Sequence, residues 1–286
     1  MKVTWVIERH IFEEEQELAL IDEVHKQGGE VKVIDPLSKY NYHNWEDYGW
    51  HLENRPVVFR GSLNLGIKTR QQAWYPGVIM STKNFNCSTY YTYWGEWMLN
   101  KDYWMMPLSQ LFNNNFIEAC LYGIQDINVP EVFIRPDSGL KQFAGGVFNL
   151  SDLRSLNGID LETLVLVAPV KQVDREYRFV VCDNKVITGS QYFEKGEYTA
   201  SLKDYSKDYG TNKASDYLKV VLHDMSCKIN WLPDQIYCVD VCESEGEFNI
   251  LELNSFSCSN LYYCDLSKVV TAANDVAISE WQQVNV

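Results

Sequence analysis

The spacing of apolar residues predicts a parallel α/β unit at the start of the chain. Val3–Ile7 and Val31–Ile34 are short apolar runs typical of buried strands. Between them, Glu13–Gln27 has the periodicity of an amphipathic helix. Pro56–Gly61 reads as a further buried strand that ends in a loop. Because strands that alternate with a helix favour parallel pairing, residues 1–80 are expected to form a parallel sheet.

The rest of the chain has a different rhythm, in which short strands are separated by turn residues. The predicted strands are Glu131–Arg135, Gly146–Asn149, Thr163–Val170, Tyr177–Cys182 and Lys185–Tyr192. Helices are predicted at Ala214–Lys228 and Leu266–Trp281, and the aromatic stretch 80–130 is expected to be mostly helical, including Leu108–Tyr122. The polar stretch Glu194–Lys213 is predicted to be a loop and a candidate lid.

A predicted β-hairpin carries the most informative chemistry. Its strands are Tyr237–Glu243 and Ile250–Phe256, joined by turn-forming residues. Asp240 lies on the first strand, and Glu252 and Asn254 project from one face of the second, since side chains two apart share a face. Two carboxylates and a carboxamide form an oxygen-only site suited to Mg²⁺. The alternative is an acidic hairpin whose polar face lies in water.

Composition narrows the classes of partner. The chain has 286 residues and a net charge of −14, which argues against a nucleic acid or an anionic membrane as partner. ATP remains compatible, because Mg²⁺ and a few basic residues neutralise phosphates locally. No apolar run approaches the roughly 20 residues that span a bilayer. The N-terminus lacks a signal-peptide cleavage pattern, so a cytoplasmic location is expected. The oligomeric state stays open.

Two basic residues precede the hairpin in a setting that suits phosphate binding. Arg135 ends a predicted strand, and Lys141 follows in a loop that leads to Gly145 and Gly146. A cation at a strand end beside a glycine-containing loop can contact phosphates. A turn with two solvated basic residues would look the same.

Two further segments have weaker patterns. Pro169 interrupts the apolar run around Ala168 and Val170, which can free backbone groups for an adenine edge, although an ordinary edge strand fits equally. Glu176 and Arg178 share a strand face, where Glu176 could bind a ribose and Arg178 a phosphate or carboxylate. A cross-strand salt bridge is the alternative.

Taken in order, these motifs resemble the ATP-grasp superfamily, which includes the D-alanine–D-alanine ligases and glutathione synthetases. They look closest to a divergent clade with arginine at the usual phosphate-binding lysine position. The motifs are Arg135-Pro-x-x-Gly, the apolar hinge, Glu176-x-Arg178, Asp240 and Leu251-Glu252-Leu-Asn254.

The resemblance implies a fold of mixed α/β and α+β class. An N-terminal parallel α/β pre-grasp domain, residues 1–80, would precede an ATP-grasp fold of two α+β subdomains, residues 81–165 and 166–286.

It also implies a role for each candidate residue. Asp240, Glu252 and Asn254 would hold Mg²⁺, Arg135 and Lys141 would contact the ATP phosphates, the backbone at Ala168–Val170 would meet adenine, and Glu176 would bind the ribose. Arg135 and Arg178 are the catalytic candidates in this half. Arg60, at a strand end beside Gly61, is the candidate for gripping substrate from the N-terminal domain.

The implied activity is an ATP- and Mg²⁺-dependent carboxylate–amine ligase that acts on a small molecule or a peptide through an acyl phosphate. Many relatives have an arginine two residues before the metal aspartate, where this chain has Cys238, and Pro-Gly after the asparagine, where it has Ser255 and Phe256. Two alternatives therefore stay open: an ATP-dependent phosphotransferase, and a non-catalytic nucleotide-binding protein with the same fold.

Overall fold

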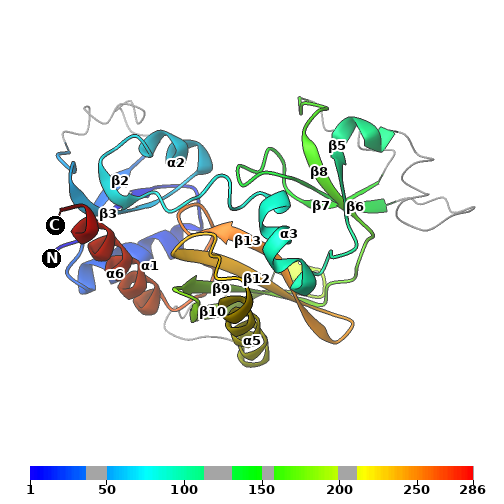
Figure 1. Ribbon diagram of the computed structural model, residues 1–286. Coiled ribbons are helices and arrows are strands. Elements are labelled where there is room, and N and C mark those ends of the chain that lie inside the picture. The colour runs from blue at the N-terminus through cyan, green and yellow to red at the C-terminus, as the bar shows by residue number, and fades with distance from the viewer. Residues whose placement is uncertain (37–49, 113–130, 150–157, 199–210, 286) are drawn as a thin grey trace, which may run out of the picture.

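The computed structural model describes residues 1–36, 50–112, 131–149, 158–198 and 211–285. They form three β-sheets with helices packed between and around them (Figure 1). The first sheet has the order β2-β1-β3-β4, and its strands pair in parallel. Its strands are β1 (Thr4–Glu8), β2 (Glu30–Ile34), β3 (Arg55–Arg60) and β4 (Trp74–Gly77).

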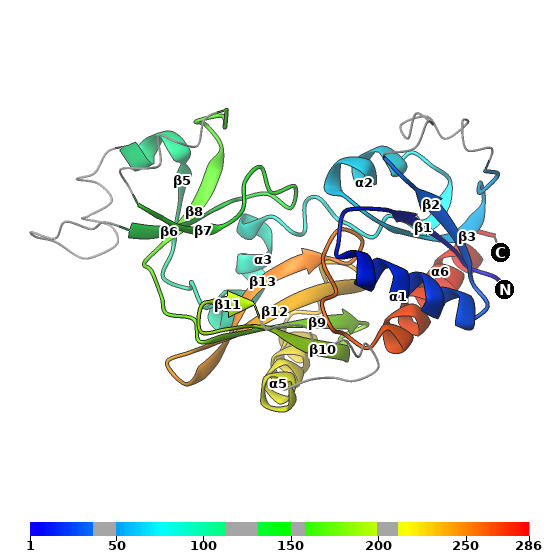
Figure 2. The ribbon, with the colours of Figure 1, turned by 180° about the vertical axis from the view of Figure 1, so that it is seen from behind.

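Helices from both ends of the sequence cover one face of this sheet. Helices α1 (Glu14–Lys26) and α6 (Leu266–Asn285) pack together on that face, while α2 (Leu63–Thr69) lies over the other (Figures 1 and 2). The Trp5 indole donates a 2.9 Å hydrogen bond to Asn274 on α6. The C-terminal helix therefore completes the core of the N-terminal sheet.

The central sheet is antiparallel and has the order β11-β10-β9-β12-β13. Its strands are β9 (Arg175–Cys182), β10 (Lys185–Glu194), β11 (Glu197–Tyr198), β12 (Ile236–Ser244) and β13 (Glu247–Ser255). Helices α3 (Cys87–Trp94) and α5 (Asn212–Lys228) bury one face. Part of the opposite face packs against α6, and the rest carries the polar side chains of the site.

The third sheet is antiparallel, has the order β5-β8-β6-β7, and is drawn in green in Figure 1. Its strands are β5 (Trp104–Pro107), β6 (Glu131–Pro136), β7 (Gly146–Asn149) and β8 (Leu164–Ala168). Short 3-10 helices span Gly95–Trp97 and Leu108–Phe112. A separate apolar cluster that includes Leu108, Ile134 and Val167 fills this module.

The predicted fold class is confirmed: a parallel α/β unit comes first, and antiparallel α+β modules follow. The predicted hairpin is β12–β13. Strand β5 was not predicted. Only the start of the helix predicted at Leu108–Tyr122 is described, and it is a 3-10 helix; most of the predicted lid, Glu194–Lys213, lies outside the described residues. The domain boundaries stay a prediction. Within the described ranges, no helix has the length and apolar character that a membrane span requires.

Candidate nucleotide and metal site

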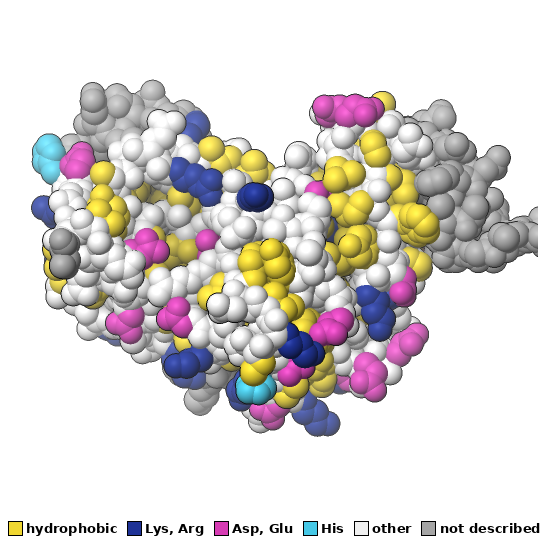
Figure 3. All heavy atoms as spheres, viewed as in Figure 1, with side chains coloured by type: hydrophobic (Ala, Val, Ile, Leu, Met, Phe, Trp, Pro, Cys, Tyr) yellow, Lys and Arg dark blue, Asp and Glu magenta, His cyan; other side chains and the backbone are white. Residues whose placement is uncertain are grey.

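A cavity of about 630 Å³ lies between the third sheet and the polar face of the central sheet. The molecular surface is indented between the first sheet and the third sheet, and Lys and Arg side chains lie near this indentation (Figure 3). Seven of the candidate residues line this cavity: Arg135, Lys141, Glu176, Arg178, Asp240, Glu252 and Asn254. They come from three segments far apart in the sequence, and Arg60, Ala168 and Val170 do not line it.

Strand register brings the acidic and basic groups together. Asp240 on β12 lies opposite Glu252 on β13 and opposite Arg178 on β9. The register shifts after Asp240, so that Val241 pairs with Ile250 and Leu251 is the extra residue of a β-bulge. As a result, Leu251 and Glu252 both line the cavity.

Arg178 and Asp240 form a buried bidentate ion pair. Nε of Arg178 donates to Oδ1 at 2.7 Å and Nη2 donates to Oδ2 at 2.6 Å. The third donor of Arg178, Nη1, bonds to the carbonyl oxygen of Asn260 at 2.8 Å. Burial raises the pKa of the Asp240 carboxyl, and the neighbouring Arg178 opposes that shift. The cross-strand salt bridge considered as an alternative for Arg178 is thus present, and it lies inside the cavity wall.

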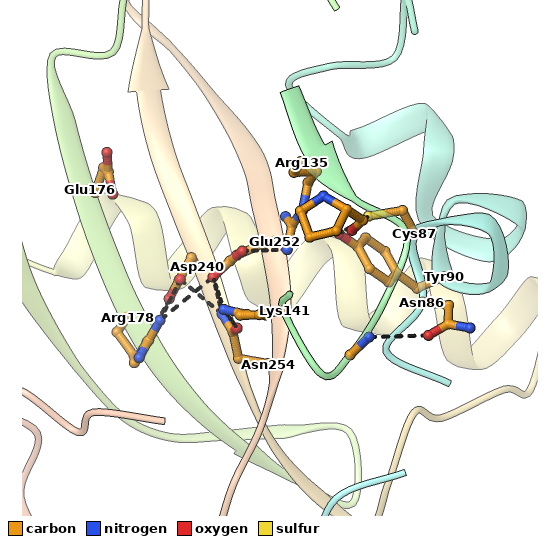
Figure 4. A network of polar contacts seen from close by, with 12 residues as sticks. Asn86, Cys87, Tyr90, Arg135, Lys141, Glu176, Arg178, Asp240, Glu252 and Asn254 are labelled. Atoms are coloured by element: carbon orange, nitrogen blue, oxygen red, sulfur yellow. Dashed lines mark hydrogen bonds and ion pairs between the residues drawn. The ribbon is translucent and has the colours of Figure 1, made fainter. Parts of the chain in front are cut away.

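Glu252 is surrounded by cations. Its carboxylate accepts from Nη2 of Arg135 at 2.6 Å and from Nζ of Lys141 at 3.1 Å, and Arg178 lies 4.0 Å away (Figure 4). Asn254 donates to the same carboxylate at 2.6 Å and to Asp240 at 3.0 Å. Burial alone would raise the pKa of Glu252, but the three cations bring it well below the ordinary value, so the carboxylate is ionised.

One nitrogen of the Arg135 guanidinium group is unpaired within the described residues. Its side chain is buried, and its Nε has no hydrogen-bond partner among the described residues. Gly145 packs directly on it, since a Cβ at Gly145 would lie 2.8 Å from Cβ of Arg135. A glycine is therefore required where the loop closes over this arginine.

Glu176 lies on β9, apart from the network around Asp240 and Glu252 (Figure 4). The Tyr192 hydroxyl donates a short hydrogen bond to its carboxylate. Burial raises the pKa of Glu176 to about 7, while the Tyr192 bond opposes the shift. The Tyr192 ring stacks on Tyr262 with centroids 4.2 Å apart, and the Arg178 guanidinium lies 5.1 Å from the Tyr262 centroid. Two tyrosines thus connect Glu176 to Arg178.

Arg60 has contacts other than the predicted ones. Its side chain is 1% exposed and donates to the carbonyl oxygens of Phe256 and Ser259. Burial lowers its pKa to about 10. Ser259 lines the cavity, so Arg60 reaches the site through the loop that follows β13. A direct grip on substrate stays a prediction.

The predicted adenine hinge lies beside the cavity. Strand β8 ends at Ala168, which is buried and pairs with Phe133, and Val170 is 41% exposed. Lys171 and Val173, just beyond them, do line the cavity. The ammonium of Lys171 bonds to the carbonyl oxygen of Leu99 at 2.5 Å. Adenine contact by the backbone at Ala168–Val170 stays a prediction.

Sequence reasoning missed Tyr192, Tyr262 and Lys171. Tyr192 ends a predicted strand and Tyr262 follows the predicted hairpin, and only the folded arrangement stacks them. Lys171 follows the Pro169 hinge by two residues, and a basic residue at that place was an available signal.

The donor set fits a hard divalent cation. Asp240, Glu252 and Asn254 offer only oxygen ligands on one face, as Mg²⁺ prefers when phosphates complete its shell. The unpartnered Nε of Arg135 beside them is suited to an anionic oxygen. In the present contacts, Asn254 turns its amide nitrogen to the carboxylates and its oxygen to Lys141, so a metal ion that binds this oxygen would take the place of the Lys141 ammonium.

Solved structures share this fold at low sequence identity. A RimK domain ATP-grasp protein from Sphaerobacter thermophilus matches with a TM-score of 0.58 and 11% identity, covering 96% of this chain and 99% of its own. The D-cycloserine synthetase DcsG matches with a TM-score of 0.57 and 12% identity, with the same coverage. The ATP-grasp ligase PsnB, complexed with minimal precursor, Mg and ADP, matches with a TM-score of 0.50 and 11% identity, covering 96% and 97%. No curated protein matches the sequence significantly.

A family model gives the assignment. The model described as the ATP-grasp domain, R2K clade family 2, matches residues 114–272, more than half of the chain. This range holds every residue of the network around Asp240 and Glu252. The chain therefore belongs to the R2K clade of the ATP-grasp family and has the ATP-grasp fold that its sequence motifs predicted.

Proposed function

We propose that the protein is an ATP- and Mg²⁺-dependent carboxylate–amine ligase. The observation that carries the proposal is the cavity in which two carboxylates and a carboxamide from one hairpin meet the cationic groups of Arg135, Lys141 and Arg178. The solved relatives include a ligase complexed with Mg and ADP and a synthetase of a small molecule, which agrees with this reaction class.

Each group would have a distinct role. Asp240, Glu252 and Asn254 would hold Mg²⁺, which supplies neutralisation of the charge on the ATP phosphates. Arg135 and Lys141 would bind the phosphates, and Glu176 would accept hydrogen bonds from the ribose. Arg178 would stabilise negative charge on the reacting carboxylate or phosphoryl oxygens, held in position by Asp240 and Tyr262.

The reaction would proceed in two transfers. A substrate carboxylate oxygen would attack the γ-phosphorus of ATP and release ADP, giving an acyl phosphate. An amine would then attack the acyl carbon, lose a proton and expel inorganic phosphate, giving an amide. No side-chain nucleophile is needed, so positioning and electrostatic stabilisation are the contributions of the protein.

Two measurements test the proposal in order. Thermal unfolding is followed first with a non-hydrolysable ATP analogue, with and without Mg²⁺; a ligand at about 100 times its dissociation constant stabilises by roughly 2.7 kcal/mol. Phosphate release is then screened over pairs of carboxylates, including peptides, and amines. Phosphate release that requires both substrates supports the ligase, whereas formation of ADP and a phosphorylated acceptor, without phosphate release, would identify a phosphotransferase. Nucleotide binding without ADP formation under any substrate mixture would identify a binding protein.

A further inference from the structure

Lys141 occupies the space between two of the proposed metal ligands. Its ammonium lies 2.6 Å from Oδ1 of Asn254 and 3.1 Å from Oε1 of Glu252 (Figure 4). Both are oxygen atoms that a divalent cation would use. The Lys141 ammonium therefore lies against the proposed metal ligands, where a metal ion would place its positive charge, and not in the open part of the cavity.

The loop that carries Lys141 is held at its base and by a hydrogen bond from the Lys141 backbone amide to the carbonyl oxygen of Ser138. The backbone amide of Ser88 donates to Asp137 at 2.7 Å, and that of Gly139 donates to Asn86 at 3.1 Å. These bonds tie the loop to the start of α3. The Lys141 side chain itself is 39% exposed, so it can change position while the base of the loop stays in place.

The charges around Glu252 oppose a metal ion that arrives alone. Asp240 and Glu252 carry two negative charges, whereas Arg135, Arg178 and Lys141 carry three positive charges, which leaves the cluster with a net charge of +1. A divalent cation must displace one of these partners or bring its own anions. Lys141 is the most exposed of the three cations and has the most flexible side chain, so it is the one that can leave.

We propose that Lys141 is a built-in counter-cation that holds the metal ligands of the free protein and moves to the nucleotide phosphates when they arrive. The metal ion and the nucleotide then enter together, and metal ions alone bind weakly. The proposal rests on the proposed function of the same site, and it concerns the order of binding rather than the chemical step.

The test measures metal affinity without turnover. Mn²⁺ binding to the full chain is followed by electron paramagnetic resonance, with and without a non-hydrolysable ATP analogue, for the wild type and Lys141→Met. Lys171→Met is the matched control, because Lys171 lines the same cavity but bonds to Leu99 and Asp102 instead of the metal ligands. Glu252→Gln and the double variant with Lys141→Met report whether Mn²⁺ uses the proposed ligands.

Without nucleotide, Lys141→Met is expected to bind Mn²⁺ about tenfold more tightly than the wild type, within the usual range for coupled sites. Lys171→Met should bind Mn²⁺ with the affinity of the wild type. Adding Glu252→Gln to Lys141→Met should remove the gain in Mn²⁺ affinity. The analogue should also bind Lys141→Met more weakly. Equal Mn²⁺ affinity in Lys141→Met and wild type, with a loss in Glu252→Gln, would overturn the lysine proposal and leave the metal site standing. If Glu252→Gln leaves the Mn²⁺ affinity unchanged, even with nucleotide present, both the lysine proposal and the proposed metal site are overturned.

Discussion

Asp240 and Glu252 lie opposite each other across the β12–β13 ladder, yet their carboxyl pKa values shift in opposite directions. Burial dominates at Asp240, which has one close cationic partner, Arg178. At Glu252, burial is outweighed by Lys141, Arg135 and Arg178. Glu252 is therefore the more firmly ionised of the two carboxylates and the one that three cationic side chains share.

Glu252→Gln is expected to abolish Mg²⁺-dependent ATP turnover and leave the fold intact. The amide oxygen can still accept from Arg135, so the structural contact survives, but the charge that attracts the metal is lost. Turnover should fall by about two orders of magnitude or more. Phosphate release and the thermal midpoint are measured together, and near-wild-type turnover would contradict the metal assignment.

Arg178→Met is expected to destabilise the protein by about 3–5 kcal/mol, because it leaves the Asp240 carboxylate buried without its partner. Adding Asp240→Asn should recover much of that loss, since the uncompensated charge is then gone. Urea unfolding of the two single variants and the double variant measures this coupling. Additive losses would show that the pair does not act as a unit.

Arg60→Met is expected to weaken binding of Mg²⁺ and nucleotide severalfold and to destabilise by about 1–3 kcal/mol, because the carbonyls of Phe256 and Ser259 lose a charged donor. Arg175 provides the control. It pairs with Glu194 and Glu243 away from the cavity lining and is 37% exposed, so Arg175→Met should cost less than about 1 kcal/mol. Calorimetric titration with the ATP analogue separates them, and equal affinities in both variants would remove Arg60 from the site.

Glu176 should make nucleotide affinity depend on pH near neutrality. Its pKa is raised by burial to about 7 in the folded protein, so the carboxylate that is proposed to accept hydrogen bonds from the ribose forms as pH rises through that value. Affinity for the analogue should increase between pH 6 and 8 in the wild type and stay flat in Glu176→Gln. Tyr192→Phe, which keeps the stacked ring and loses the donor, should shift the transition to higher pH. A pH-independent wild type would exclude this role.

The same shift predicts the pH dependence of stability. The folded protein holds a proton on Glu176 between the ordinary glutamate pKa and about 7, whereas the unfolded chain releases it. Unfolding therefore becomes easier as pH rises through this window. Relative to Glu176→Gln, the wild type should lose stability from pH 5 to 8, as measured by urea unfolding. A constant difference between the two would show that Glu176 is not protonated in the fold.

Local patterns were sufficient for the hairpin but not for its neighbours. Asp240, Glu252 and Asn254 could be placed on one face because both strands are close in sequence and alternate regularly. That Arg178 would face Asp240 depends on β9 pairing with β12, a long-range choice that no local signal specifies. The stacking of Tyr192 on Tyr262 depends on the same kind of contact.

Two further differences have similar causes. Strand β5, Trp104–Pro107, was not predicted because its residues do not alternate, and it is a strand through its pairing with β8. Arg60 was predicted to grip substrate from a strand end, whereas the loop after β13 folds over it and buries it between the rings of Phe12 and Phe256.

The packing of α6 on the first sheet has a consequence for synthesis on the ribosome. Val269 and Val270 of α6 share a core with Trp5 and Ile7, and the Trp281 indole donates to the carbonyl oxygen of Asn54. Helix α1 covers part of that face of the sheet, and burial of the face is complete only once residues 266–285 have been made. The N-terminal sheet therefore completes its core only after the strands that bear the proposed metal ligands have been made.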